Sequence, residues 1–289
     1  MDLGRKVIAM EKHPVKKVVE TLNISRSNQY QTKRPRPARY KRKDDDESLG
    51  EIKAVCKERA TYGVRRVAAI VNRKRKKEGL CRRNKKKIER LMRINGLLLP
   101  KSGSREERAH DGKVITLRSD TRYCSDIFNI KCWNGEVICV AFSLDCHDRE
   151  SISYVAEPRP LVHQDIMKLM DQTVSERFGS NIERLPHVIE WLSDNGPQYI
   201  AKETKEYGRT WGLAIITTPS YSPESNGMAE VFVKTFKRDY VYTNELPNAL
   251  TVLRKLPEWF WDYNENAPHS GLKFLSPKEY RKSTNQVSV

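Results

Sequence analysis

The sequence Tyr123-Cys124-Ser125-Asp126-Ile127-Phe128-Asn129-Ile130 decides the class of fold, because its apolar alternation is typical of a β-strand. A second apolar stretch follows at residues 137–145, after Trp133-Asn134-Gly135-Glu136. The Asn-Gly pair in between tolerates the positive φ angles of a tight hairpin turn. A third strand is expected at residues 151–156. The pattern therefore predicts three consecutive antiparallel strands.

Helices and strands alternate after these three strands. A helix is expected from Val162 to Phe178, followed by a strand that ends at Asp194. A helix over residues 201–211 and a short strand over residues 213–217 come next. The polar loop from Pro219 to Gly227 then leads into another helix. We therefore predict an α/β fold built on a mixed five-stranded sheet with flanking helices.

The start of the chain has the periodicity of helices instead. The first apolar stripe comprises Val15, Val18, Val19 and Leu22. Ser25 is a suitable N-cap for a second helix, so residues 1–32 have the outline of a helix-turn-helix. The side chains of that second helix that can read base edges are Arg26, Asn28 and Gln29. An ordinary αα-hairpin fits the same pattern.

A second helical module is predicted over residues 48–99. Its apolar stripes comprise Val64, Val67, Ala68, Ile70 and Val71 in one helix, and Ile88, Leu91, Met92 and Ile94 in another. Basic clusters lie between and beside these stripes, and they predict contacts with DNA phosphates, although solvated helix faces have the same composition. The candidate residues in the clusters are Arg73, Arg75, Lys76, Arg82, Arg83, Lys85 and Lys86.

These patterns divide the chain into six parts. Prolines and runs of charge indicate two exposed linkers. The predicted division is a helix-turn-helix-like segment at 1–32, a linker at 33–47, a basic helical module at 48–99, a linker at 100–118, the α/β core at 119–242 and a helical tail at 243–289.

The net charge of +17 is concentrated in the first part of the chain. Residues 1–118 hold 35 Lys and Arg against 14 Asp and Glu, whereas residues 119–289 hold 19 against 23. Such an asymmetry indicates a region that binds the nucleic-acid backbone, joined to a domain with a different task. The charge alone fits RNA as well as DNA.

The composition of the 289-residue chain excludes several classes of protein. The longest near-continuous apolar run, Val137 to Leu144, is too short to span a bilayer, and the N-terminus leads into no signal-peptide core. The six cysteines include no CxxC pair, and the six histidines have no zinc-ligand spacing. We expect free thiols, no membrane association and a reducing, cytosolic location.

Three carboxylates occupy positions that suit catalysis better than solvation. Asp126 and Asp194 are expected at the ends of buried strands, where an unpaired carboxylate is costly, and Glu230 lies in the helix after the polar loop. If they meet at one edge of the sheet, the three can bind two Mg²⁺ (or Mn²⁺) ions. Two such ions activate a water or 3′-hydroxyl nucleophile and stabilise the leaving oxygen in phosphodiester transfer.

The helix that carries Glu230 adds basic residues beside this predicted site. Residues 230, 234 and 237 share one helical face, so Lys234 and Lys237 can grip the substrate backbone near the scissile phosphate. A plain ion pair with Glu230 explains Lys234 equally well. Asn226, in the preceding loop, is a further candidate contact for DNA.

Several strings resemble the core of bacterial insertion-sequence transposases. They are residues Tyr123–Asp126, Leu144–Arg149, Leu192–Gly196 and Ser222–Glu230, continued by residues 232–240, 261–264, 268–272 and 276–280. Thirty-five residues separate Asp194 from Glu230, which is the interval of the "IS three" family in its second-frame (OrfB) product. That family belongs to the retroviral integrase-like (DDE) superfamily. The string Tyr62–Arg66 is similar to the helical module that usually precedes this core.

The resemblance implies an RNase H-like catalytic core in which Asp126, Asp194 and Glu230 are catalytic and bind metal. It implies Mg²⁺-dependent strand cleavage and transfer at the terminal inverted repeats of an insertion sequence, at the bacterial nucleoid. It adds Arg65 and Arg66 to the candidate DNA contacts. The implied partners are double-stranded DNA, further copies of the chain on that DNA, and the first-frame (OrfA) protein, fused or separate, because no sustained heptad repeat is present here.

Two other functions fit parts of the sequence. A non-catalytic DNA-binding regulator with a decayed integrase-like domain would be equally basic, but the intact carboxylate triad argues against decay. A hydrolase of RNA–DNA hybrids would share the RNase H-like core. The large basic region before residue 119 favours an anchored duplex substrate instead.

Overall fold

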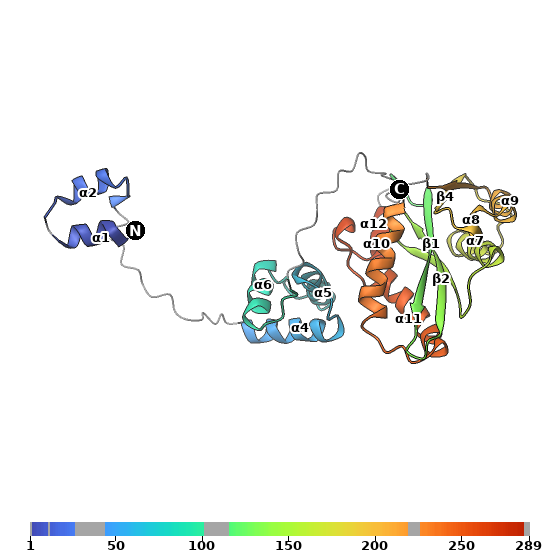
Figure 1. Ribbon diagram of the computed structural model, residues 1–289, viewed down its shortest axis with the longest axis horizontal. Coiled ribbons are helices and arrows are strands. Elements are labelled where there is room, and N and C mark those ends of the chain that lie inside the picture. The colour runs from blue at the N-terminus through green and yellow to red at the C-terminus, as the bar shows by residue number, and fades with distance from the viewer. Residues whose placement is uncertain (1, 11, 27–43, 101–115, 219–225, 286–289) are drawn as a thin grey trace. The chain divides into compact units, whose positions relative to one another are not determined.

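The computed structural model describes residues 2–10, 12–26, 44–100, 116–218 and 226–285 (Figure 1). Clustering of contacts separates two compact units, residues 1–45 and residues 46–289. In the first unit, helix α1 spans Asp2–Ala9 and helix α2 spans Val15–Thr21. Helix α2 confirms the first predicted helix, and Val18 from its predicted stripe is buried. Asn28 and Gln29 of the predicted base-reading helix lie outside the described residues.

Three helices form a small module at the start of the second unit. They are α4 (Asp45–Glu58), α5 (Val64–Lys77) and α6 (Lys85–Ile94), and we call residues 45–99 the three-helix module. Its buried core includes Ile52, Val67, Val71, Ile88, Leu91 and Met92. Both predicted apolar stripes therefore face this core, except that Ile94 is 47% exposed at the end of α6. Asn84 caps α6 by accepting a hydrogen bond from the Lys86 N–H at 2.8 Å.

The acidic run at residues 44–47 differs from its predicted place in a linker. Helix α4 begins at Asp45, which is buried, and Glu47 forms ion pairs with Arg75 at 3.0 Å and with Arg83 at 2.6 Å. Acidic side chains in the first turn of a helix also interact favourably with its partial positive charge. The run therefore begins the three-helix module, and the linker ends before it.

The core domain is built on the predicted mixed sheet of five strands. The strands are β1 (Arg122–Lys131), β2 (Val137–Asp145), β3 (Ser151–Glu157), β4 (Ile189–Ser193) and β5 (Leu213–Thr217). Their order is β3-β2-β1-β4-β5. The first three strands pair antiparallel, and β4 pairs parallel with both β1 and β5. Gly135 has a φ of 92° in the turn between β1 and β2, as the Asn-Gly signal predicted.

Helices cover both faces of this sheet (Figure 1). One face packs against α7 (His163–Phe178), α8 (Pro197–Ile200) and α9 (Lys202–Trp211). The other packs against α10 (Gly227–Phe236) and α11 (Ala249–Glu265). A π-helical turn (Lys237–Val241) continues α10, and a 3-10 turn (Ser270–Leu272) and α12 (Pro277–Asn285) follow α11. No described helix is long and apolar enough to cross a membrane.

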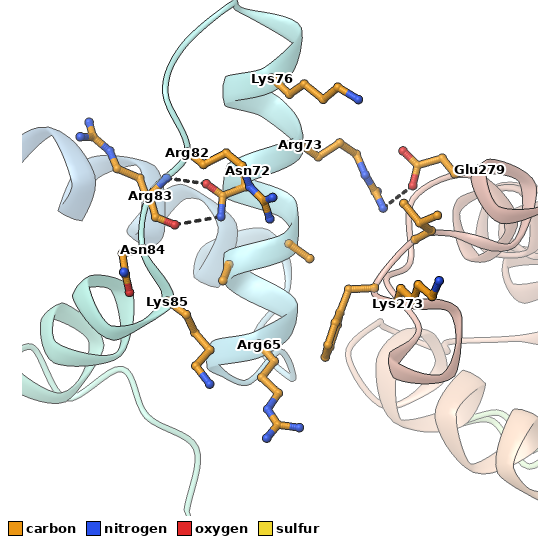
Figure 2. Close-up of a pocket in the computed structure, with 14 residues that line it drawn as sticks. Arg65, Asn72, Arg73, Lys76, Arg82, Arg83, Asn84, Lys85, Lys273 and Glu279 are labelled. Carbon is orange, nitrogen blue, oxygen red and sulfur yellow. Dashed lines mark hydrogen bonds and ion pairs between the residues drawn. The ribbon is translucent and has the colours of Figure 1, made fainter. Parts of the chain in front are cut away.

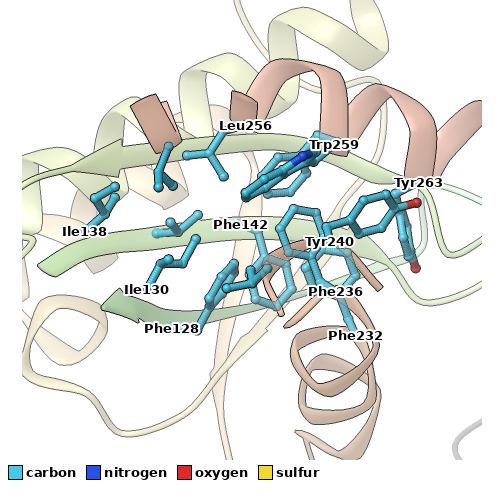
Figure 3. Packing of buried hydrophobic residues seen from close by; sticks show 14 of the residues in the cluster. Phe128, Ile130, Ile138, Phe142, Phe232, Phe236, Tyr240, Leu256, Trp259 and Tyr263 are labelled. Carbon is cyan, nitrogen blue, oxygen red and sulfur yellow. The ribbon is translucent and has the colours of Figure 1, made fainter. Parts of the chain in front are cut away.

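Aromatic side chains dominate the face covered by α10 and α11. Figure 3 shows rings from β1 and β2 meeting rings from both helices. The ring centroids of Phe142 and Phe232 are 4.3 Å apart, and Phe236 lies 4.6 Å from Phe260. Such pairs contribute about 0.5–1.5 kcal/mol each beyond the burial of their area. The packing therefore fixes α10 firmly over the middle of the sheet.

The predicted boundary at residue 242 does not separate two cores. Val252, Leu256 and Phe260 of α11 are buried in the same cluster as Phe128 and Phe142 of the sheet. The region predicted as a separate helical tail is therefore an integral layer of the core domain. Its helical character was predicted correctly, but its packing on the sheet was not.

Candidate active site

Asp126 lies in β1, and Asp194 directly follows the neighbouring parallel strand β4. Cys124 of β1 pairs with Leu192 of β4. Asp126 and Asp194 each come two residues later, so they lie at the same level of the sheet. Cys124 and Leu192 belong to the cluster on the α10 side. Because side chains alternate between faces, Asp126 and Asp194 face that side as well.

The position of Asp126 differs from the prediction that it ends a strand. It is the fifth residue of the central strand β1, which continues to Lys131 through its pairing with β2. Strand β4 ends at Ser193, so Asp194 follows it directly and is exposed. The short β4 leaves the second half of β1 without a parallel neighbour. The two aspartates therefore lie where the sheet becomes accessible.

Glu230 comes from the helix that covers this face. It lies in the first turn of α10 and is exposed, whereas Ala229, Phe232 and Phe236 of the same helix are buried against the sheet. A carboxylate in the first turn also suits the partial positive charge of a helix N-terminus. The packing of α10 thus presents Glu230 on the same side as the two aspartates.

The charges of the other two carboxylates act on Asp126. Burial and, to a smaller extent, the negative charges of Asp194 and Glu230 raise the pKa of Asp126 to about 6. The Ile127 N–H, which donates a hydrogen bond to Asp126 Oδ1 at 2.7 Å, and the charge of Lys237 lower this pKa. Within the described residues, none of the three carboxylates forms an ion pair.

The three carboxylates are not, however, grouped as metal ligands. Across the described parts of the chain, no set of three His, Cys, Asp or Glu side chains is arranged to hold a metal ion. The loop before α10, residues 219–225, is outside the described residues. The structure therefore places Asp126 within reach of the charges of Asp194 and Glu230, without forming a complete ligand set among the described residues.

Hydrogen bonds at and behind the aspartates were not predicted from the sequence. The hydroxyl groups of Ser125 and Tyr199 are 2.6 Å apart, and both side chains are buried. The Gly196 N–H donates to Asp194 Oδ1 at 3.0 Å. Tyr199 thus ties α8 to β1 at the residue next to Asp126. No local sequence signal identifies this pair, because the partners lie 74 residues apart.

Asn226 has a different role from the predicted contact with DNA. Its side chain is buried, and Nδ2 donates to the Ser125 carbonyl oxygen at 3.3 Å. Asn226 therefore links the start of α10 to β1. Its Oδ1 atom has no hydrogen-bond partner among the described residues. Lys237, predicted beside the scissile phosphate, is half-buried, with its Nζ 5.6 Å from the Phe128 ring centroid.

Four arginines predicted as DNA contacts are engaged within the protein. The ion pairs are Arg66 with Asp239 at 2.7 Å, Arg73 with Glu279 at 2.6 Å, Arg75 with Glu47 and Glu51, and Arg83 with Glu47 at 2.6 Å. Arg66 also lies over the Tyr62 ring at 3.5 Å. These guanidinium groups are largely buried, so they serve to hold helices together. The prediction that they grip phosphate is therefore not supported.

The other predicted basic residues point outward. Those that are exposed are Arg26, Arg65, Lys76, Arg82, Lys85, Lys86 and Lys234. Arg26 belongs to the first unit, and Lys234 lies on α10 one turn after Glu230. Because they are exposed, these cations are available to a polyanion, whereas the four paired arginines are not.

A second group of carboxylates surrounds a buried arginine in the same domain. Arg177 of α7 is 1% exposed and forms ion pairs with Asp120 at 3.4 Å, Asp145 at 3.6 Å, Asp148 at 3.2 Å and Glu150 at 3.3 Å. Three of these acids lie between Asp145, the last residue of β2, and Glu150. We call Arg177 and its four acids the Arg177 cluster. Asp145 and Asp148, which belong to the string Leu144–Arg149 noted in the sequence, therefore stabilise the fold.

The chain matches known families along most of its length. Residues 43–104 match an HTH-like domain, and residues 117–223 and 212–277 match the integrase core domain. The HTH-like match thus falls on the three-helix module rather than on residues 1–32. The second integrase-core match includes α11, in agreement with its packing on the sheet.

The chain is also similar to curated proteins and, more distantly, to solved structures. The chain is 41% identical over 244 residues to the transposase InsD for insertion element IS2D of Escherichia coli strain K12, covering 84% of this chain and 80% of that protein. Another relative, InsD for IS2-9, has the same identity over 79% of its length. A simian T-cell lymphotropic virus intasome has a TM-score of 0.48 at 15% identity, covering 80% of this chain and 74% of that one. The Mos1 mariner transposase catalytic domain has a TM-score of 0.42 at 16% identity, covering 58% and 76%.

The identity to the InsD proteins extends through both the three-helix module and the core. The predicted RNase H-like core is therefore confirmed, as is the predicted class of enzyme, a polynucleotidyl transferase. The chain belongs to the family of insertion-sequence transposases that carry an integrase core domain.

Proposed function

We propose that this transposase cuts and joins DNA at the terminal inverted repeats of an insertion sequence, with Asp126, Asp194 and Glu230 as its catalytic residues. The observation that supports the proposal is that the charges of Asp194 and Glu230 act on the partly buried carboxylate of Asp126, while none of the three forms an ion pair among the described residues. A partly buried carboxylate whose pKa is raised by neighbouring negative charges, as that of Asp126 is, is costly for stability, and such groups are concentrated at functional sites.

The donor set fits a hard divalent cation. Carboxylate oxygens are the ligands that Mg²⁺ and Mn²⁺ prefer, and the mutual repulsion that raises the pKa of Asp126 is relieved by a bound cation. Asp126, Asp194 and Glu230 would hold two ions, with phosphate oxygens and water as the remaining ligands. When bound, the ions supply activation of the attacking hydroxyl and stabilisation of the leaving oxygen.

The protein's own groups orient the carboxylates and the substrate. The Ile127 and Gly196 N–H groups each donate to one aspartate, at 2.7 Å and 3.0 Å, and fix the direction of its oxygens. Lys234 and Lys237 lie on the helix of Glu230 and supply positive charge for the backbone beside the reacting phosphate. Such preorganised charge stabilises the transition state without further rearrangement.

The substrate and partners follow from the relatives and from the exposed charge. The relatives are named as transposases for insertion elements, so we propose element ends as the substrate of this chain. Exposed Arg65, Lys76, Arg82, Lys85 and Lys86 of the three-helix module would contact the duplex. Further copies of the chain and the first-frame (OrfA) protein, fused or separate, complete the proposed assembly.

The direct test is incubation with a duplex that carries the element's own terminal repeat, with Mg²⁺ or with EDTA, followed by mapping of the nicked strand. We expect nicks at the repeat only with Mg²⁺ and none with Asp194→Asn. Glu203→Gln, an exposed acid in the first turn of α9, is the matched control and should cut normally. If a folded, DNA-binding Asp194→Asn protein cut at the original rate, the proposed site would be wrong. Binding without cutting by the natural chain would favour a regulator instead.

A further inference from the structure

A basic cavity lies between the three-helix module and the segment that follows α11. Its volume is about 1160 Å³, and its lining includes Arg65, Lys76, Arg82 and Lys85 on one wall and Lys273 on the other. Figure 2 shows Arg65, Arg73 and Lys76 on α5, with Lys273 and Glu279 opposite them. We call this cavity the basic cleft. Only one acidic residue, Glu279, is among its described lining residues.

The charge of the basic cleft is not neutralised by the protein. Two further lining arginines are paired: Arg73 with Glu279 at 2.6 Å, and Arg83 with Glu47 at 2.6 Å. In the part of the chain that the structure describes, no ion pair is formed by the other five cations of the lining. The cleft therefore presents five positive charges with no partner among the described residues, and no described acid remains unpaired within it.

Ion pairs and hydrogen bonds hold the two walls of the basic cleft together. Arg73 donates to the Asn266 carbonyl oxygen at 2.7 Å as well as pairing with Glu279. Arg59 forms a two-point contact with Asp262 of α11 at 2.5 and 2.6 Å. Planar two-point contacts of this kind fix orientation as well as distance. The cleft is thus a property of the folded second unit.

Lys273 is held in an unusual backbone conformation at the second wall. Lys273 and Phe274 have φ angles of 55° and 64°, in the left-handed region that side chains other than glycine rarely adopt. The turn is closed by hydrogen bonds from the Phe274 N–H to the His269 carbonyl oxygen at 2.8 Å and from the His269 N–H to the Leu275 carbonyl oxygen at 3.1 Å. Strained conformations persist where the surrounding structure determines them, and they are frequent at ligand-binding sites.

We propose that the basic cleft binds one stretch of duplex DNA through its phosphates, with Lys273 contacting the same duplex as the cations of the three-helix module. A cavity of this volume with charges on two walls suits a chain of phosphates better than a single anion. The inference rests on the proposed function only for the identity of the polyanion. It extends the DNA-binding surface from the three-helix module onto the catalytic domain. The duplex would thereby be held by both parts at once.

The test measures binding of the full chain to a fluorescently labelled 30-base-pair duplex of arbitrary sequence, in EDTA, over a series of salt concentrations. Each phosphate contact adds about 0.9 to the steepness of the plot of log affinity against log salt concentration. At about 0.1 M salt, loss of one such contact corresponds to about eightfold weaker binding. We expect Lys273→Gln and Lys76→Gln each to weaken binding by about eightfold and to lower the slope by about one. Lys168→Gln, an exposed lysine of α7, is the matched control and should change neither.

The variants separate the possible outcomes. If Lys273→Gln behaves like Lys168→Gln while Lys76→Gln weakens binding, DNA contacts the three-helix module alone and the proposal is wrong. If neither lining variant changes the slope, the basic cleft does not bind DNA. Lys273→Arg should retain binding, and thermal unfolding of each variant checks that the turn remains folded. Because EDTA prevents cutting, a chain that binds as expected but never cuts element ends would refute the proposed function and leave this inference standing.

Discussion

Two groups of carboxylates in the core domain contrast in how their charge is balanced. In the Arg177 cluster, four acids surround a buried arginine, and Arg281 pairs with Glu150 from the other side at 3.2 Å. Around Asp126, the nearby charges of Asp194 and Glu230 are of the same sign, and Lys237 is the cation that lowers its pKa. The negative charges of the Arg177 cluster are therefore balanced by arginines, whereas those around Asp126 are left uncompensated.

The difference shows how to recognise a reaction site among 37 acidic residues. Buried acids that serve the fold are paired and hydrogen-bonded, because a lone buried charge is strongly destabilising. Acids that serve chemistry stay available to a cation or a substrate. The two groups therefore predict opposite responses to substitution, one in activity and the other in stability.

Replacing Asp126 by an uncharged residue should have the largest effect of these substitutions. It should lower activity without lowering stability. We expect Asp126→Asn to reduce strand transfer by about a thousandfold or more, which corresponds to about 4 kcal/mol of transition-state stabilisation. Its free energy of unfolding should stay the same or rise, because one of three like charges is removed. Strand-transfer assays and chemical denaturation on the same preparation check both parts. A large loss of stability would show that Asp126 supports the fold, as the acids of the Arg177 cluster do.

Removing the central cation of the compensated group should mainly affect stability. Arg177→Met leaves four buried or half-buried acids without their shared partner, and we expect it to lower the free energy of unfolding by about 3–5 kcal/mol. Chemical denaturation measures this change, with Arg209→Met, an exposed residue of α9, as control. An Arg177→Met protein as stable as the control would show that the cluster does not support the fold.

The protonation of Asp126 itself can be followed by pH in the absence of divalent metal. The pKa of Asp126 is raised from 3.8 to about 6, so the folded state favours the protonated carboxyl. The natural chain should therefore lose stability relative to Asp126→Asn as pH rises from about 4 to about 6, with little further change above. Burial and the charge of Asp148 also raise the pKa of Asp145 to about 6, but Asp145 is present in both proteins and cancels in the difference. Parallel stability curves for the two proteins over this range would contradict the prediction.

The smallest expected effect concerns the hydrogen bond behind Asp126. Tyr199→Phe removes the hydroxyl that lies 2.6 Å from the Ser125 hydroxyl, and we expect a loss of about 1 kcal/mol of stability. Strand transfer should fall only several-fold, because the carboxylates themselves remain in place. Tyr207→Phe is the control, since its hydroxyl bonds to Asp171 of α7 rather than to a residue of β1. A rate loss as large as that of Asp126→Asn would mean that Tyr199 takes part in the chemistry.

The parts of the structure that local pattern determines could be predicted from the sequence. The five strands and the main helices follow from apolar periodicity, and the Asn-Gly turn follows from backbone preference. The position of Asp126 within β1 could not be predicted, because strand length depends on the pairing partner rather than on the strand itself. The candidate triad was identified by its setting and by resemblance, and its catalytic role stays a prediction.

The basic residues show the limit of sequence reasoning more sharply. Arg65 and Arg66 are neighbours in the chain, yet Arg65 is exposed and Arg66 pairs with Asp239, far away in the sequence. Lys273 was not predicted as a DNA contact, because its place beside the three-helix module depends on how α11 packs. Which cations are free is decided by long-range contacts, and these leave no local signal.

The packing of α11 on the sheet has a consequence for the inheritance of mobile elements. Residues 249–267 supply much of the aromatic layer over β1 and β2. A copy of the gene interrupted by a stop codon after residue 242 would leave Phe128, Phe142 and Phe232 exposed to water. Such a truncated product would aggregate or be degraded rather than persist as a shortened DNA-binding competitor. A damaged copy of this kind would fall silent without repressing intact copies elsewhere in the genome.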